Sequence, residues 1–172
     1  MLIGDSNKFA IQFDLNADYG GFWMFGKFCY WIGGIRIGDY ESGTSLRDVL
    51  FSLESLVKDN SNRSNEKLFN LDAKECFNRL NEALYGDSNQ YDSISIEESW
   101  ARFNVCPLLD IFNDWKIFLV EYKGSARFLI RNLNSVKKTD DILEYIVQVR
   151  EFETELYKTY ELLSEIYENE IK

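Results

Sequence analysis

The sequence predicts an α+β fold, in which one antiparallel sheet of about five or six strands is packed by two or three helices. Short alternating apolar segments bounded by glycine-rich turns are typical of antiparallel strands. Other segments repeat their apolar residues at the 3.6-residue spacing of an amphipathic helix. The chain has 172 residues, of which 45% are hydrophobic, and this is enough to bury a sizeable core. We therefore expect a single domain over residues 1–172.

The first strands are expected in and next to the part of the sequence that is richest in glycine and aromatic residues. Seven of the ten glycines fall within residues 20–51, and six of the ten residues from Phe22 to Trp31 are aromatic. We expect strands over 8–15 and 22–32, the second with one fully apolar face and one mostly apolar face. Gly26, inside the second strand, predicts a bulge or a close approach by another backbone.

A hairpin and two helices follow. Gly33 and Gly34 form a two-residue hairpin turn, which leads into a short strand over 35–38. A cap at Thr44 or Ser45 and the apolar spacing from Leu46 to Val57 predict a helix over about 45–59. A second helix is expected over roughly 72–85, because Asp72 and Glu75 have the spacing of a capping box and Gly86 follows.

The second half of the chain is less regular. We expect a polar loop over 86–95, a helical turn within 97–103, a hairpin of strands 115–122 and 126–131, and a turn at 137–141. Residues 142–149 are ambiguous, because they are β-branched enough for a strand yet keep helical spacing with the residues that follow. We favour a strand over 142–148 and a helix over about 151–168, and one long helix from 141 is the alternative.

The charge of the chain excludes several kinds of partner. The formal net charge is −10, which argues against phosphate backbones and anionic membrane surfaces but suits a basic protein. Residues 139–172 hold ten acidic and three basic side chains, so 3 − 10 = −7 of this charge lies there. Residues 1–15 lack a signal-peptide pattern, and no segment has the length and apolarity of a membrane span. We expect a cytoplasmic protein.

Catalytic and metal-binding patterns are missing from the sequence. It contains no histidine, which removes the usual general base and the commonest metal ligand. No dinucleotide-binding or phosphate-binding loop is present. Cys29, Cys76 and Cys106 are far apart and are expected to be buried free thiols, and most of the four tryptophans are expected in the core. We predict no enzyme activity, no cofactor and no metal.

Several motifs resemble those of a known family. The chain is similar to the bacterial immunity 42 family in Ile3-Gly4-Asp5, Lys8–Ile11, Gly26–Ile32, Gly38-Asp39-Tyr40 and Gly43–Asp48. The resemblance is clearest over residues 1–60 and continues more weakly through the hairpin at 115–131 and the helix that contains Phe152. Members of this family are found beside polymorphic toxins delivered between competing bacteria. The resemblance implies a non-enzymatic inhibitor that binds the C-terminal domain of its cognate toxin and blocks the active site or an essential surface. A basic nuclease is one candidate for that toxin.

Two loops are candidate toxin contacts. Asp39, Tyr40 and Glu41 follow the short strand, and a tyrosine flanked by carboxylates suits an interface with a basic protein. Asp18 and Tyr19, in the preceding turn, have similar chemistry. The alternative is structural, with Gly38 and Gly43 shaping the loop and Thr44 or Ser45 capping the helix. For the whole chain, the alternative is an acidic adaptor or structural subunit without catalytic activity. The sequence leaves the oligomeric state open.

Overall fold

The structure, a computed structural model, describes residues 1–86, 99–134 and 142–172. Within these ranges the strands form two antiparallel sheets. Sheet A has the order β1-β2-β3-β4, with β5 also paired to β3, and sheet B has the order β6-β7-β8. Sheet A comprises β1 (Leu2–Gly4), β2 (Phe9–Leu15), β3 (Phe25–Ile32), β4 (Ile35–Ile37) and β5 (Thr44–Ser45). Sheet B comprises β6 (Trp115–Tyr122), β7 (Ser125–Asn132) and β8 (Leu143–Gln148). The α+β class is confirmed, with the strands divided between two sheets instead of one.

Four α-helices are described: α1 (Leu46–Lys58), α2 (Glu66–Phe69), α3 (Ala73–Tyr85) and α5 (Glu151–Glu170). The first three begin at polar caps, where the side chains of Ser45, Asn65 and Asp72 accept a hydrogen bond from a backbone amide three residues later. These caps satisfy amides that the first helical turn leaves unpaired. The helices expected over 45–59 and 72–85 are confirmed. Among the helices of the described ranges, none has the length and apolar character needed to cross a bilayer.

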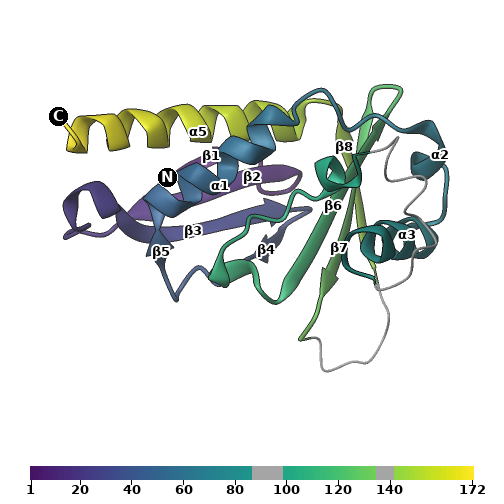
Figure 1. Cartoon of the computed structure of the whole chain (residues 1–172), viewed down its shortest axis with the longest axis horizontal. Coiled ribbons are helices and arrows are strands. Elements are labelled where there is room, and N and C mark those ends of the chain that lie inside the picture. The colour runs from purple at the N-terminus through teal and green to yellow at the C-terminus, as the bar shows by residue number, and fades with distance from the viewer. Residues whose placement is uncertain (87–98, 135–141) are drawn as a thin grey trace.

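The main core lies between sheet A, sheet B and two helices. Figure 1 shows α1 and α5 together on one side of sheet A, with sheet B and α3 towards the other end of the molecule. Paired residues of β2 and β3 face this core, among them Phe9 opposite Ile32 and Ile11 opposite Tyr30. The Phe9 ring lies 5.6 Å from Phe128 of sheet B and 4.9 Å from Phe152 of α5, measured between centroids. Aromatic packing therefore joins the two sheets and the last helix.

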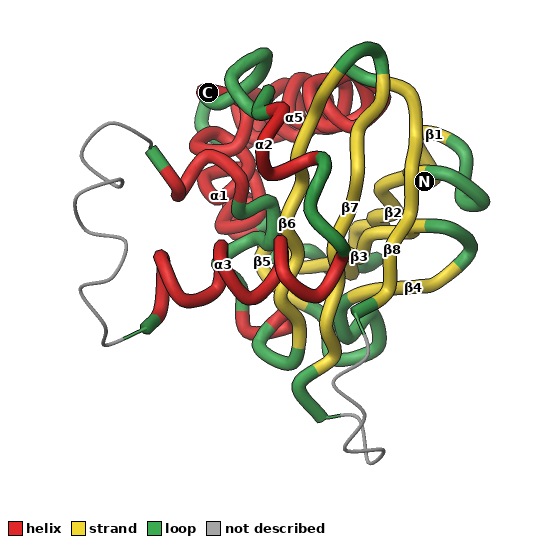
Figure 2. The backbone as a smooth tube through the Cα atoms, turned by 90° about the vertical axis from the view of Figure 1, so that its right-hand side faces the viewer, coloured by secondary structure: helices red, strands yellow, loops and turns green. Residues whose placement is uncertain are grey.

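Sheet B is covered on both faces. Figure 2 shows its three strands side by side. Alternate residues of β6 and β7, such as Leu119 and Phe128, face the main core. Phe118 and Leu129 face a second core with α3, where Phe118 lies 5.0 Å from Phe77. This explains why both strands read as nearly continuous apolar runs.

The long strand expected over 22–32 is shorter in the structure. β3 starts at Phe25, because Gly21–Trp23 form a 3-10 turn and Met24 adopts a left-handed conformation. Gly26 meets a close backbone approach, as predicted: a Cβ atom there would lie 2.3 Å from the Asp14 carbonyl oxygen. The hairpin turn at Gly33 and Gly34 is also confirmed, with positive φ at both residues.

The ambiguity near the end of the chain is resolved in favour of a strand followed by a helix. β8 ends at Gln148, Arg150 has a left-handed conformation with φ 70°, and α5 begins at Glu151. One long helix from 141 is therefore wrong. The helical turn expected within 97–103 is a 3-10 turn at Trp100–Phe103. The turn expected at 137–141, and the loop expected over 86–95 beyond Gly86, lie outside the described residues.

Buried charges connect α1, β6 and α5. Arg63 is fully buried, and its Nη2 donates a 2.7 Å hydrogen bond to the carbonyl oxygen of Leu56 at the end of α1. Its Nη1 lies 3.6 Å from a carboxylate oxygen of Glu153 in α5. Glu121 of β6 is also buried, and burial raises the pKa of its carboxyl group. The positive charge of Arg63 is therefore enclosed with two carboxylates.

Candidate partner-binding surface

Asp39, Tyr40 and Glu41, here termed the acidic loop, fold back over the outer face of sheet A. Tyr40 is only 8% exposed, so its side chain does not project from the loop as a direct toxin contact would require. Its ring lies beneath the Lys27 ammonium and the Arg36 guanidinium, at 5.5 and 5.7 Å from the ring centroid. Its hydroxyl donates to the Asp14 carboxylate and accepts from the Gln12 amide. Tyr40 therefore belongs to the packing of the sheet.

The two carboxylates of the acidic loop are exposed, and both have partners within the chain. Asp39 accepts hydrogen bonds from the amides of Glu41 and Ser42, both at 3.2 Å, and from the Ser42 hydroxyl. The hydrogen bonds from Ser42 lower the pKa of Asp39. Glu41 lies 2.6 Å from the Lys27 ammonium, which lowers the pKa of its carboxyl group. These contacts hold the loop in one conformation.

Asp18 and Tyr19 lie in the connection between β2 and β3. Asp18 is exposed, and its carboxylate accepts a 3.4 Å hydrogen bond from the amide of Gly20. The half-buried Tyr19 donates to Glu170 Oε1 at 2.6 Å, and this hydrogen bond raises the pKa of the tyrosine. Tyr19 therefore ties this connection to the end of α5.

Beyond Tyr19, residues Gly20–Phe25 form what we term the aromatic turn. Phe22, Trp23 and Phe25 are all exposed, whereas the Met24 side chain between them is buried. The Phe22 and Trp23 rings lie 5.0 Å apart, and the Trp23 and Phe25 rings lie 6.2 Å apart with nearly parallel planes. The sequence pattern predicts that these rings belong to the scaffold of a long strand. The sequence signal that points to a turn here is the Gly20-Gly21 pair, which favours left-handed backbone conformations.

Backbone contacts hold the aromatic turn in place. Gly20, Gly21 and Met24 all have positive φ, of 68°, 59° and 55°. The amide of Phe25 donates to the carbonyl of Tyr19 at 2.7 Å, and the hydroxyl of the helix cap Ser45 donates to the carbonyl of Trp23 at 2.9 Å. The left-handed conformation turns Met24 inwards and leaves its neighbours outside.

The aromatic turn borders a hollow that is also lined by the residues directly after the acidic loop. This hollow has a volume of about 340 Å³. Phe25 of the aromatic turn lines one part of it, and Ser42, directly after the acidic loop, lines another. The structure therefore brings one of the two predicted contact regions next to an exposed aromatic cluster that sequence reasoning missed.

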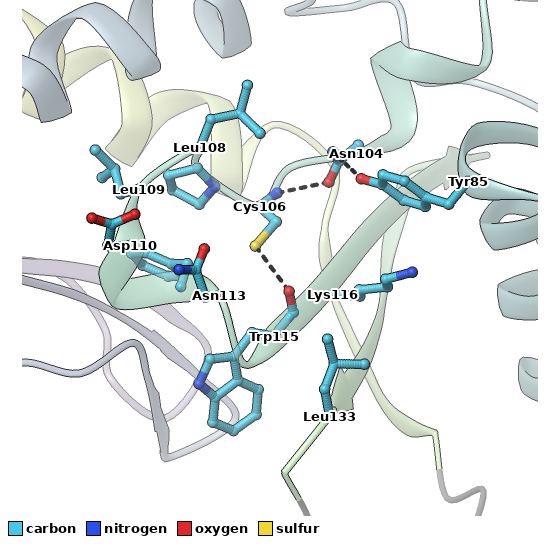
Figure 3. Close-up of a pocket in the computed structure, with 12 residues that line it drawn as sticks. Tyr85, Asn104, Cys106, Leu108, Leu109, Asp110, Asn113, Trp115, Lys116 and Leu133 are labelled. Atoms are coloured by element: carbon cyan, nitrogen blue, oxygen red, sulfur yellow. Dashed lines mark hydrogen bonds between the residues drawn. The ribbon is translucent and has the colours of Figure 1, made fainter.

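A second hollow, of about 420 Å³, lies at the start of β6 (Figure 3). Tyr85, Asn104, Cys106 and Trp115 are among its lining residues. The Cys106 sulfur points to the carbonyl of Trp115 at 3.4 Å, and burial raises the pKa of its thiol to about 12. Such a thiol is a weak nucleophile at neutral pH. Within the described ranges, no group of three or more histidine, cysteine or acidic side chains is arranged to hold a metal ion.

Comparison with known proteins identifies the family. The family model described as immunity protein 42 matches residues 1–169. The chain belongs to the immunity protein 42 family. The resemblance first evident over residues 1–60 thus extends along almost the whole chain. The comparison with curated proteins gives no match.

One solved structure shares the fold of this family member. It is the crystal structure of CdiI from Burkholderia dolosa AUO158, with a TM-score of 0.70 and 22% sequence identity. The match covers 94% of this chain and 99% of that chain. Both sheets and the helices that pack against them therefore belong to a fold found in that CdiI protein.

Proposed function

We propose that this protein is a bacterial immunity protein that binds its cognate toxin and neutralises it by blocking the active site or an essential surface. The observation that carries the proposal is the family match over residues 1–169. The protein acts in the cytoplasm as a stoichiometric inhibitor and not as an enzyme. Its Cys106 thiol is unreactive at neutral pH, and it has no histidine to serve as a general base.

The toxin is a basic protein in this proposal, and a nuclease is the leading candidate. A net charge of −10 favours association with a positively charged surface and raises the rate of encounter. A nuclease needs such a surface to hold the phosphate backbone, so an acidic inhibitor could occupy it directly.

The exposed carboxylates contribute to this contact. We place Asp18, Asp39 and Glu41 at its edge, where charges guide association more than they add affinity. Tyr19 and Tyr40 support the contact indirectly, because their hydroxyl groups donate hydrogen bonds to Glu170 and Asp14 within the chain.

Co-expression tests the proposed function. The C-terminal domain of the toxin encoded beside this protein is expressed with and without it, and survival is counted. Cells should survive only when the protein is present, and the purified pair should elute as a 1:1 complex. Equal killing in both cultures would reject the proposal. Stopped-flow mixing of the purified pair tests the acidic loop. Asp39→Lys with Glu41→Lys should slow complex formation, and an unchanged association rate would remove the acidic loop from the contact.

A further inference from the structure

The aromatic turn continues onto an exposed part of α1, next to α5. Arg47, in the first turn of α1, places its guanidinium 3.8 Å from the centroid of the Trp23 ring. Phe51 lies four residues later, on the same side of the helix, and its ring is 5.7 Å from Tyr167 of α5. Phe22, Trp23, Phe25 and Phe51 are 41–51% exposed. We term these four residues and Arg47 the aromatic face.

The composition of the aromatic face is that of an interface centre. Tryptophan and arginine dominate the few residues that carry most binding energy in protein complexes, and large exposed apolar patches with polar rims mark interaction sites. Other exposed apolar side chains, such as Leu108 and Ile146, come from separate elements, the 3-10 turn region before β6 and the strand β8. Scattered residues of that kind are ordinary on a protein surface.

Hydrogen bonds hold the backbone of the aromatic turn in one conformation. A left-handed conformation at a residue other than glycine costs of the order of 1–2 kcal/mol, and Met24 adopts one. The hydrogen bonds to Tyr19, Gly21 and Ser45 maintain it. A backbone held in this way loses little conformational entropy on binding, which favours high affinity.

The charges around the aromatic face select the partner. Asp48 holds Arg47 through two hydrogen bonds, of 2.8 and 3.0 Å, and offsets its charge. Asp18 precedes the turn, and Glu170 lies next to it at the end of α5. The rim is therefore negative, as is the molecule as a whole. A second copy would meet the same negative rim and a net charge of −10, whereas a basic protein would be attracted.

We propose that the aromatic face is the central contact for the basic toxin domain, with Trp23 as its main binding residue and Arg47, whose side chain is 18% exposed, supporting the Trp23 ring. This inference rests on the proposed function and specifies where the toxin binds. The acidic loop then lies at the edge of the contact, across the hollow lined by Phe25 and Ser42.

Titration calorimetry with the purified toxin domain tests this placement. Trp23→Ala should weaken binding by about 30-fold or more, the change that defines a dominant interface residue. Arg47→Ala removes the side chain that supports the Trp23 ring and should weaken binding by about tenfold. Phe51→Ala provides a variant outside the turn and should weaken binding by about tenfold. The control is Tyr157→Ala, because Tyr157 is similarly exposed on α5 but ten residues from Tyr167, or about 15 Å along the helix. It should bind within about twofold of the unmodified protein. Thermal unfolding of each free variant confirms that it is folded.

The outcomes separate this inference from the proposed function. If the unmodified protein binds and protects while Trp23→Ala, Arg47→Ala and Phe51→Ala bind equally well, the placement is overturned and the proposed function stands. If the unmodified protein neither binds nor protects, both fail. If Trp23→Ala disrupts a dimer of the free protein in sedimentation but leaves toxin affinity unchanged, the face serves a second copy and the inference is overturned.

Discussion

The acidic loop and the aromatic turn are short connections next to β3, and they use their side chains in opposite ways. In the acidic loop, Tyr40 is buried under Lys27 and Arg36, and the two carboxylates bond to groups of the same chain. In the aromatic turn, Phe22 and Trp23 are exposed although they are apolar. The polarity of a side chain therefore does not show whether it can bind a partner. A charged side chain with partners in the same chain has less to offer another protein than an exposed ring.

Truncation of Tyr40 should give the largest change in stability among the variants of these two regions. Tyr40→Ala removes a nearly buried ring together with its hydrogen bonds, and loss of a buried aromatic side chain costs roughly 3–5 kcal/mol. Tyr40→Phe keeps the ring and loses the hydroxyl contacts to Asp14 and Gln12, which should cost about 1 kcal/mol. Urea unfolding followed by circular dichroism measures both values.

The same two variants test whether Tyr40 acts within the fold or at the interface. Under conditions where both are folded, each should bind the toxin domain within about threefold of the unmodified protein. A Tyr40→Phe variant of unchanged stability but much weaker binding would contradict our assignment and return Tyr40 to the contact surface.

The sequence predicts an element of the fold well where the element depends only on neighbouring residues. The caps at Ser45 and Asp72, the hairpin at Gly33 and Gly34, and the close approach at Gly26 each depend on residues near one another in the sequence. Division of the strands into two sheets depends instead on long-range packing, such as Phe9 against Phe128. No local pattern contains that information.

The candidate surface was only partly predictable for a related reason. The sequence pattern predicts Tyr40 as a candidate contact, but its burial depends on Lys27 and Arg36 from two neighbouring strands. The exposure of Trp23 follows from positive φ at Met24, a conformation that is uncommon for residues other than glycine. An aromatic run with apolar alternation favours a strand on pattern alone. The left-handed conformation of Met24 instead places the start of β3 at Phe25.

Adding a methyl group at Gly21 should lower the stability of the protein by less than the truncation of Tyr40 does. Gly21 has φ 59°, and a Cβ atom there would meet only the Glu170 carboxylate at 3.7 Å, so Gly21→Ala tests backbone conformation with little steric conflict. We expect a loss of about 1 kcal/mol in the free energy of unfolding and faster dissociation from the toxin domain. Gly86→Ala is the control, because its φ of −82° suits alanine and the atoms nearby belong to the flexible Glu82 side chain.

The two glycine variants give a clear decision. Equal stability of Gly21→Ala and Gly86→Ala would mean that the turn does not depend on its left-handed conformation. The backbone of the turn would then not be fixed before binding.

The smallest effect should come from acidification, which acts on the acidic loop. The pKa of Asp39 and that of Glu41 are lowered from ordinary values of 3.8 and 4.5 by Ser42 and Lys27. A carboxyl group with a lowered pKa stabilises the fold above its ordinary pKa, and this contribution disappears as the pH falls through the folded value. The Asp39→Asn, Glu41→Gln double variant lacks this contribution, so its melting temperature should fall less than that of the unmodified protein between pH 5 and about pH 3.

The quantity to measure is the difference in melting temperature between the unmodified protein and the double variant. Glu121 has a raised pKa and changes stability with pH in the opposite direction, but it does so in both proteins. High salt should narrow the difference, since the Lys27–Glu41 pair is exposed and therefore screened. Identical melting curves at every pH would show that these carboxylates do not hold the loop. The aromatic turn would then no longer differ from it in the way proposed, and Asp39 and Glu41 would be as free as Trp23 to meet the toxin.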